Sequence, residues 1–516
     1  MAKKTEVDIE NIQGSIWPRL PKYYETFLFF KITDTDVFKT HLRSIADKIT
    51  TGAQCKEYFL EINDLPQSTP GKPRVDIPPE ERKPFEAVNI SFSYKGIEKL
   101  VMQRRGDKLD DELHIRGMYK DMVFEGPDDP ELLADEYKPP KGHRADNDEW
   151  RVDGLLIVTA QTKDKLDEKV EEVQRNFNVG TASSSIEIAF RKHGNLRNAD
   201  GKAEKAQGGT FSLHGKEHFG FEDEISQPQI RGLDPEPGNG HQRNIPPGLI
   251  FTGLDGDKAK HPDWATEGSF LVFREIEQKV PEFNKFMKES SKQIPSFDDG
   301  TGEKLAAYLM GRWKNGSPVE LDPDGTKPEY IFADNFDYAK GHTLIKNTKC
   351  PFAAHIRKMR PRADLYLETQ HTEDEEEIAA NQQVSNTNVI IRRGITFGPE
   401  VDEVEEAEET KHKRGIYFLC YQSDIRNGFN MLIARWASNR TFAPNTGVEG
   451  GPGVDPIISQ RNHPEHPEGY VSIYDQPTDK LPYKLPLKFV SWTDQRGGEY
   501  FFTPSIKALK TKLSEE

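Results

Sequence analysis

The order of apolar patterns near the N-terminus constrains the fold of this chain more than any other feature. Residues 26–33 (TFLFFKIT) form a nearly continuous apolar run, which is typical of a buried strand. Phe38, Leu42, Ile45 and Ile49 then recur at helical spacing, three or four residues apart. The chain therefore begins with a strand followed by an amphipathic helix.

Two more strands, a second helix and a fourth strand follow in the same part of the chain. Residues 88–94 alternate between apolar and polar side chains as a half-buried strand does, and residues 155–160 form a second continuous apolar run. Residues 166–177 carry apolar side chains on one helical face, and residues 186–190 alternate again. The resulting order, βαββαβ, predicts an α+β unit of the split βαβ, or ferredoxin-like, type with an antiparallel sheet.

A second unit is expected because 516 residues exceed the size at which one hydrophobic core keeps growing. The Pro- and Gly-rich residues 231–248 are the best candidate for a boundary. We therefore predict two ferredoxin-like units, residues 1–232 and residues 233–516. The expected elements of the second unit are strands at 269–274, 389–392, 416–422 and 499–502, helices beginning near Pro281 and Gly302, and a helix that carries Ile425, Phe429, Leu432 and Trp436 on one face.

The charge of the chain argues against nucleic acid as a partner. The formal net charge is −16, and acidic residues gather at 373–377 and at 402–409. We interpret both acidic blocks as solvated loops. Residues 126–148, rich in acidic residues, Pro and Lys, are expected to form a surface insertion.

Segments for targeting or membrane insertion are not evident in the sequence. No apolar run approaches the roughly 20 residues that a helix needs to cross a bilayer, and residues 1–14 lack the apolar core of a signal peptide. We therefore expect no membrane contact and a cytoplasmic location. The mature form of a secreted protein would have the same features, so that alternative stays open.

The cysteines exclude several kinds of site. Cys55, Cys350 and Cys420 are odd in number and stand at no metal-like spacing, which argues against a disulfide framework and against a zinc site. Cys350 and Cys420 have apolar neighbours and are expected to be buried. The sequence contains no CxxCH, so any haem would be bound without thioether links.

Three short strings join charged residues to apolar neighbours. They are GFEDEISQP at 220–228, CPFAAHIRKMRPR at 350–362 and IIRRGITFGPE at 390–400. An ionisable group in apolar surroundings is costly unless it is paired or has a function. Each string alone has a simpler interpretation, as a turn or helix cap, a surface histidine or an ion pair. The joint occurrence of all three favours a functional site.

Together the strings resemble the motifs of dye-decolourising peroxidases. Asp223 in the first string matches the aspartate that acts on the distal side of the haem in that family, His355 in the second matches the histidine that ligates the iron, and Arg392 in the third matches the distal arginine. The resemblance continues through NIQGSIWPRLPKYYETFLFF, CYQSDIRNGF, GVDPIIS and GGEYFFTPSI, and so covers nearly the whole chain. The family fold, a pair of ferredoxin-like units with haem held mainly by the second, agrees with the predicted element order.

The resemblance implies non-covalent haem b with His355 as the ligand of the iron. A carboxylate that accepts the other ring N–H of such a histidine fixes its tautomer and makes it more electron-rich, and Asp455 in GVDPIIS is the candidate. The other residues expected to contact the cofactor are Arg360, Arg392, Ile416 and Phe418, the last two as an apolar distal wall.

The implied activity is that of a haem peroxidase, a monomer or homodimer that reduces hydrogen peroxide and oxidises bulky organic substrates, such as dyes and phenols, in one-electron steps. Asp223 would move the proton of the peroxide, and Arg392 would stabilise the developing negative charge. The family motif closes with glycine where this chain has Glu224, which is unfavourable if φ is positive at that position. We expect Glu224 to point away from the distal site.

Two other functions stay open on the sequence. One is a haem-binding or iron-handling protein of the same fold with little peroxidase activity, against which Asp223 and Arg392 argue. The other is an acidic structural protein without a cofactor, in which His463 and His466 would be ordinary loop residues. Trp436 is a candidate for electron relay from bulky substrates, although packing in the core is the interpretation that we favour.

Overall fold

The computed structural model describes residues 3–62, 79–101, 107–141, 148–200, 213, 215–235, 244–338, 349–362, 364, 386–444, 446, 448–459, 470–473, 483–486 and 492–515. The acidic block at 373–377 and the histidines His463 and His466 lie outside these ranges.

The N-terminal half contains the predicted βαββαβ unit. Its strands pair in the order β4-β1-β3-β2, all antiparallel, which is the strand order of a ferredoxin-like unit. The predicted helices and strands are thus confirmed, with α2–α4 as additional helices. The elements are β1 (Tyr24–Ile32), α1 (Thr35–Ile45), α2 (Gly52–Glu61), β2 (Glu86–Phe92), α3 (Tyr94–Val101), α4 (Glu112–Arg116), β3 (Gly154–Ala160), α5 (Lys163–Asn176) and β4 (Ile186–Asn195).

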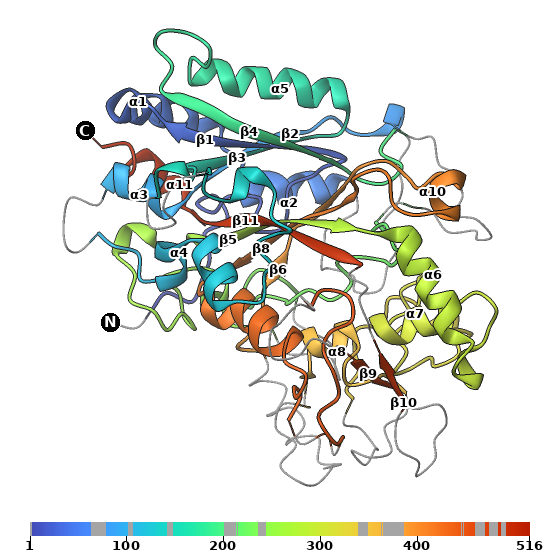
Figure 1. Cartoon of the computed structure of the whole chain (residues 1–516). Helices are drawn as coiled ribbons and strands as arrows, with labels where there is room; N and C mark the ends of the chain where they lie inside the picture. The colour runs from blue at the N-terminus through green and yellow to red at the C-terminus, as the bar shows by residue number, and fades with distance from the viewer. Residues whose placement is uncertain are drawn as a thin grey trace.

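Strand β1 shows why its sequence is apolar throughout. Side chains alternate across a strand, so Leu28 and Phe30 pack in the cluster that includes α1 and α5, while Phe27 and Phe29 pack on the opposite face. Both faces of the sheet are covered at this point, and a strand with two buried faces is apolar at every position. Helices α1 and α5 lie over one face of the sheet at the top of Figure 1.

The C-terminal half repeats the same strand order. Strands β11, β5, β8 and β6 are neighbours in that order, and β7 also pairs with β8. The elements are β5 (Ser269–Gln278), α6 (Val280–Ser291), α7 (Glu303–Met310), α8 (His355–Met359), β6 (Ile391–Arg392), β7 (Ile395–Phe397), α10 (Glu403–Ala407), β8 (Gly415–Gln422), the π-helix η12 (Arg426–Ala437), the pair β9 (Tyr470–Ile473) and β10 (Tyr483–Pro486), β11 (Thr493–Thr503) and α11 (Ile506–Lys510). The fold is α+β with two ferredoxin-like units, as predicted.

The two units share one sheet. Strands β2 and β11 join them through the pairing of Phe92 with Phe502, which gives a sheet of nine strands. The two edges of this sheet also meet, because the hydroxyl of Thr396 in β7 donates to the carbonyl of Asn195 in β4 at 2.6 Å. The sheet therefore closes on itself as a barrel does. The boundary between residues 232 and 233 stays a prediction.

Most described residues of the predicted surface insertion at 126–148 are exposed or half-buried, but three of them, Asp128, Leu133 and Tyr137, are buried. Asp128 and Tyr137 are buried, and their side chains bond to strand β5. Asp128 pairs with Arg274 at 2.5 Å, and the Tyr137 hydroxyl donates to Glu275 at 3.1 Å. These contacts fix the segment to β5 and pair the buried Arg274 with a carboxylate, while Glu275 also pairs with Lys192 at 2.6 Å.

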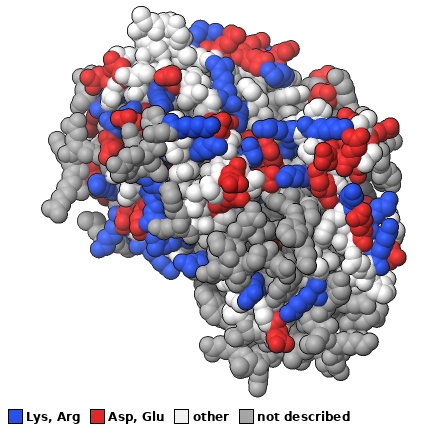
Figure 2. All heavy atoms as spheres, viewed as in Figure 1, with Lys and Arg blue, Asp and Glu red and all other residues white. Residues whose placement is uncertain are grey.

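The surface of the protein carries both charges. On the face shown in Figure 2, acidic and basic side chains are interspersed over the described residues. None of the helices in the described ranges combines the length and the apolar character that a bilayer crossing requires. The cytoplasmic location stays a prediction from the sequence.

Candidate active site

One large cavity collects the predicted site residues. It lies between the sheet of the C-terminal unit and helices α8 and η12, and its empty space, counted out to its open mouth, is about 1720 Å³. Its lining includes His355, Arg360, Asp223, Arg392, Ile416 and Phe418. Asp455 is not in the lining and lies behind His355. Predicted site residues nearly 200 positions apart in the sequence, Asp223 and Phe418, thus meet in one cavity.

His355 is the first residue of helix α8, which Figure 1 shows below the sheet. Its Nδ1 lies 2.8 Å from Oδ2 of Asp455, which is fully buried. The other oxygen of Asp455 accepts the backbone N–H groups of Ile457 at 2.8 Å and Ile458 at 3.1 Å. A carboxylate held in this way orients the Nδ1–H of the histidine and leaves the lone pair of Nε2 for a metal.

Asp223 and Arg392 form an ion pair in the same cavity. Nη1 of Arg392 donates to Oδ1 of Asp223 at 2.6 Å, and Nη2 donates to the carbonyl of Ser226 at 3.1 Å. The side chains of Asp223 and Arg392 are 32% and 28% exposed, so both can contact small molecules that enter from solvent. The pair combines a proton acceptor with a permanent positive charge, as acid–base chemistry on a small polar molecule requires.

Gln227 is a site residue that the sequence did not single out, although it lies in the first motif string. Its side-chain amide donates to the carbonyl of Arg392 at 3.0 Å and accepts the N–H of Arg392 at 3.1 Å. This double contact ties the loop that carries Asp223 to strand β6. The positions of Asp223 and Arg392 are therefore set jointly.

Glu224 has the backbone conformation that favours glycine. Its φ is 61°, in the left-handed region, where a side chain is strained. Its N–H donates to Oδ1 of Asp223 at 2.6 Å. Its carboxylate points away from the cavity and lies 3.4 Å from Nη1 of Arg19. Glu224 thus supports Asp223 through its backbone.

The cavity has an apolar wall and an excess of positive charge. Ile416 and Phe418 alternate along β8 and both face the cavity. Arg312 and Arg362 share one carboxylate, Asp334, at 3.1 Å and 2.9 Å. Two arginines on a single aspartate leave a net positive charge at this edge of the cavity.

Arg360 adds a third guanidinium to the same edge. It donates to the amide oxygen of Asn386 at 3.2 Å, and burial, followed by the charge of Arg362, lowers its pKa to about 10. A buried guanidinium is stabilised by an anion that accepts its hydrogen bonds.

These features fit haem. The cofactor is a flat apolar ring with two carboxylates, and the cavity offers apolar walls, surplus arginines and a histidine nitrogen free for iron among the described residues. All three cysteines of the chain are described and buried, and none lines the cavity, so no thioether link is available.

Arg274 is a second residue that the sequence analysis missed. It stands in an otherwise apolar stretch of β5, is 1% exposed and lines the cavity, where its guanidinium lies 5.5 Å from the ring centroid of Phe429. The available signal was the apolar run of residues 270–273 that leads directly into this charged residue. Its partner, Asp128, lies in the segment that the sequence analysis placed at the surface.

Trp436 is buried in the cavity wall and does not reach the surface. It is 5% exposed and stacks on Phe442 with ring centroids 4.9 Å apart and an interplanar angle of 6°. Packing in the core, the interpretation favoured on the sequence, describes this position.

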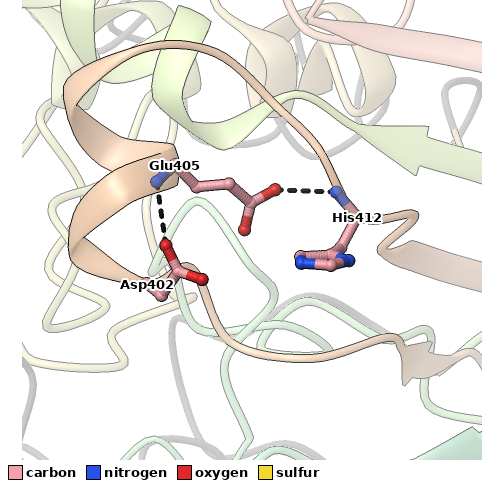
Figure 3. Close-up of side chains that lie close together, drawn as sticks. All are labelled: Asp402, Glu405 and His412. Carbon is pink, nitrogen blue, oxygen red and sulfur yellow. Dashed lines mark hydrogen bonds between the residues drawn. The ribbon is translucent and has the colours of Figure 1, made fainter.

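A separate group of possible metal ligands lies in the segment between β7 and β8 and does not line this cavity. Asp402, Glu405 and His412 place ligand atoms within 4.8 Å of one another (Figure 3). Asp402 caps helix α10, and Glu405 accepts the N–H groups of Lys411 and His412 at 2.6 Å and 2.8 Å.

Glu405 also pairs with the buried Arg414 at 2.5 Å. Burial would raise the pKa of Glu405, but the hydrogen bonds from Arg414 and the two N–H groups outweigh it and lower the pKa to about 2. The acidic block at 402–409 is exposed to solvent at every residue except the buried Glu405, and its residues 403–407 form helix α10 where the sequence predicted a loop.

A histidine that is hydrogen-bonded to a carboxylate faces an apolar cavity with arginines at its edge. This arrangement is that of a haem enzyme, which is the class of this protein. Two family models match the chain. One, described as the DyP dimeric alpha+beta barrel domain, matches residues 11–198, and the other, described as Dyp-type peroxidase, C-terminal, matches residues 249–442. The chain belongs to the dye-decolourising peroxidase family and is a peroxidase.

Known proteins of this family resemble the chain over nearly its whole length. The dye-decolorizing peroxidase AauDyP1 of Auricularia auricula-judae is 32% identical over 528 residues, which cover 99% of this chain and 88% of that protein. The dye-decolorizing peroxidase msp1 of Mycetinis scorodonius is 32% identical over 98% of this chain and 88% of its own length. The solved structure of an ancestral D-type dye-decolorizing peroxidase has a TM-score of 0.79 and 35% identity, and the match covers 99% of this chain and all of that one.

Proposed function

We propose that this peroxidase binds haem b without covalent links, reduces hydrogen peroxide and oxidises bulky organic and aromatic substrates, such as dyes and phenols, in one-electron steps. The observation that carries the proposal is that His355 with Asp455 and Asp223 with Arg392 meet at one cavity. A solved structure with 30% identity and a TM-score of 0.75, matched over 99% of this chain, is a complex with 2,6-dimethoxyphenol, which supports a phenol as a reducing substrate.

His355 would hold the cofactor. Asp455 accepts its Nδ1–H and so keeps the Nε2 lone pair directed at the cavity, and the negative charge of Asp455 makes the imidazole a stronger electron donor. Arg312, Arg360 and Arg362 would bind the carboxylates of the cofactor. When bound, haem supplies the redox chemistry, taking oxidising equivalents from peroxide and passing them on one at a time.

Asp223 and Arg392 would act on hydrogen peroxide. The carboxylate of Asp223 takes the proton from one peroxide oxygen and returns it to the other oxygen, which leaves as water. Arg392 stabilises the negative charge on the peroxide after the first proton transfer. With haem bound in the cavity, Ile416 and Phe418 would line a small apolar space beside it, so bulky substrates would give up their electrons from outside that space. The proposed partners are peroxide and the organic reductant, and the chain acts as a monomer or a homodimer.

The absorption spectrum and the turnover of the purified protein test this function. We expect a Soret band and a peroxide-dependent oxidation of the dye ABTS and of 2,6-dimethoxyphenol. A Soret band without peroxide-dependent oxidation would support the haem-binding or iron-handling alternative. The absence of a Soret band after reconstitution with haem would rule out both functions.

A further inference from the structure

A buried carboxylate in the lining of the haem cavity has no role in the reaction proposed above. Glu217 is 7% exposed and lines the same cavity as Asp223, which follows it by six positions in the sequence. Its carboxylate accepts hydrogen bonds only from uncharged groups, and no lysine or arginine forms an ion pair with it among the residues that the structure describes. A buried carboxylate without a cation is costly, so these hydrogen bonds must offset that cost.

Three N–H groups donate to the carboxylate of Glu217. Oε1 accepts the backbone N–H of Phe221 at 2.8 Å, and Oε2 accepts the backbone N–H of Phe219 at 2.8 Å. Oε2 also accepts the side-chain amide of Gln278 at 2.5 Å. Both oxygens are therefore acceptors, and an amide of the same size would turn its NH₂ group toward at least one of these donors.

The two backbone N–H groups belong to the tip of a short hairpin, residues 215–223, that ends at Asp223. The arms of the hairpin are joined where the N–H of Asp223 donates to the carbonyl of Gly215, and where the N–H of Glu217 donates to the carbonyl of Phe221, both at 3.0 Å. An antiparallel bridge lies between these two bonds. The carboxylate of Glu217 thus closes the tip, and the closed tip sets the direction in which the chain reaches Asp223.

The third hydrogen bond fixes the hairpin to the sheet. Gln278 is the last residue of β5, and it is buried in the lining of the same cavity. On the other side of Asp223, Gln227 bonds to the main chain of Arg392 in β6. Strand β8 lies between β5 and β6 (Figure 1). The segment that carries Asp223 is therefore anchored to the sheet on both sides of β8.

The side chain of Asp223 has few contacts of its own. It accepts Nη1 of Arg392 and the N–H of Glu224, both at 2.6 Å, and it is 32% exposed. Its position therefore depends on where the main chain is held before and after it. A displacement of a reacting group by about 1 Å can lower a rate by about 10²-fold.

We propose that Glu217 and Gln278 are positioning residues for the peroxide reaction, which hold the hairpin so that the carboxylate of Asp223 stays in place beside Arg392. This inference rests on the proposed role of Asp223. Glu217 itself takes no proton and touches no substrate, so a change at Glu217 should act only through Asp223.

A double-mutant cycle of Glu217→Gln with Asp223→Asn tests the proposal in the full-length holoprotein. The rate of the Soret change after mixing with hydrogen peroxide is measured per haem. Glu217→Gln alone should keep its haem and react about tenfold or more slowly. In the Asp223→Asn background the same change should slow the reaction by less than about twofold. Equal slowing in both backgrounds, or loss of haem from Glu217→Gln, would overturn the proposal.

Cyanide binding to the ferric protein gives a second readout that does not depend on turnover. Hydrogen cyanide releases its proton when it binds, and a carboxylate in the right place can accept that proton. Glu217→Gln should weaken cyanide binding about threefold or more, the effect of one weakened hydrogen bond, and should have no effect in the Asp223→Asn background. A purely structural role would lower the stability of the protein and leave this affinity unchanged, which would contradict the proposal.

A second variant and a matched control complete the test. Gln278→Met keeps the length of the side chain without the donor, so it should also slow the reaction, and it decides the outcome if Glu217→Gln does not fold. Glu282→Gln makes the same change in a carboxylate that accepts the N–H and the hydroxyl of Thr410 and does not line the cavity. This control should react at the wild-type rate, and slowing equal to that of Glu217→Gln would overturn the proposal.

The same measurements separate this inference from the proposed function. If Asp223→Asn is slow while Glu217→Gln and Gln278→Met react at the wild-type rate, the positioning role is wrong and the proposed function stands. If Asp223→Asn itself reacts at the wild-type rate, the proposed role of Asp223 is wrong, and the positioning role is wrong with it.

Discussion

The two sides of the haem cavity hold their charged residues in different ways. On the His355 side, Asp455 is fully buried and receives three hydrogen bonds, one from the imidazole and two from backbone N–H groups. On the side where we propose that peroxide reacts, Asp223 and Arg392 are about one-third exposed. A buried carboxylate whose oxygens are all hydrogen-bonded fixes the orientation of the histidine that it contacts. An exposed ion pair can instead contact a small molecule, and its carboxylate can exchange protons with that molecule.

The difference between the two sides follows from how far along the sequence the hydrogen-bond partners of each carboxylate lie. Asp455 follows a Gly-rich turn and directs one oxygen at the N–H groups two and three residues ahead, so its geometry is set locally. Asp223 depends on distant contacts, since Arg392 and Gln227 hold its loop against β6. Variants on the His355 side should therefore affect the retention of the cofactor, and variants on the Asp223 side should affect the rate of the peroxide reaction.

The largest effect is expected from His355→Ala, because it removes the nitrogen proposed to bind iron. The purified variant should contain little or no haem, as measured by the ratio of Soret to protein absorbance. His412→Ala, which changes an exposed histidine, is the matched control and should keep its haem. Haem retention by His355→Ala at the wild-type level would show that His355 is not needed to hold the cofactor, which would contradict the role assigned to the His355 side.

Arg392→Leu should retain haem and slow peroxide consumption by about 10²–10³-fold, the usual effect of losing a charge that stabilises a reacting anion. Steady-state turnover with excess dye measures this. Arg392→Lys keeps the charge but not the forked contact with Asp223 and Ser226, so it should recover part of the rate. If the Arg392→Leu variant instead lost haem and kept its rate per haem, Arg392 would be needed to retain the cofactor and not for the peroxide reaction, which would contradict the comparison.

Asp455→Asn should weaken haem retention about 10–100-fold, as expected when the partner of a metal-ligating histidine is changed. The amide oxygen of asparagine can still accept the N–H groups of Ile457 and Ile458. The NH₂ group then faces Nδ1 of His355 and cannot accept its N–H. The rate of haem transfer to excess apomyoglobin reports the effect. Unchanged transfer would mean that His355 does not need this carboxylate.

The smallest effect concerns the strained residue beside Asp223. At φ 61° glycine is favoured over residues with a Cβ, so Glu224→Gly should be about 1 kcal/mol more stable than Glu224→Ala. Both variants lose the same contact with Arg19, which makes alanine the matched control. Urea unfolding at constant pH gives the two free energies of unfolding. Equal stability, or greater stability of Glu224→Ala, would show that this backbone position is not strained in solution.

The sequence predicted most elements of the fold because their signals are local. The run at 26–33 and the spacing of Phe38, Leu42 and Ile45 correspond to β1 and α1, and the same holds for β3 and α5. The joining of the two sheets was not predictable, since it depends on one pairing, Phe92 with Phe502, between residues about 400 positions apart. Local periodicity carries no information on such a contact.

The residues of the candidate site also fall into two groups, those that a local sequence signal identifies and those that it does not. His355, Asp223 and Arg392 lie in short strings that combine charge with apolar neighbours, so they could be singled out. The Arg274–Asp128 pair could not, because Asp128 stands in a polar segment and is buried only through a partner on a distant strand. A polar residue at the surface and a polar residue paired in the core have the same sequence pattern.

The most direct test of the account is rapid mixing of Asp223→Asn holoprotein with hydrogen peroxide, with the Soret band followed over time beside the wild type. Asparagine keeps the shape of the side chain but cannot take up the proton of the peroxide. We predict full haem content and a Soret change slowed by about 10²–10⁴-fold, the range for the loss of a general acid–base group. A variant with full haem that reacts at the wild-type rate would contradict the role of Asp223 and, with it, the assignment of the two sides of the cavity.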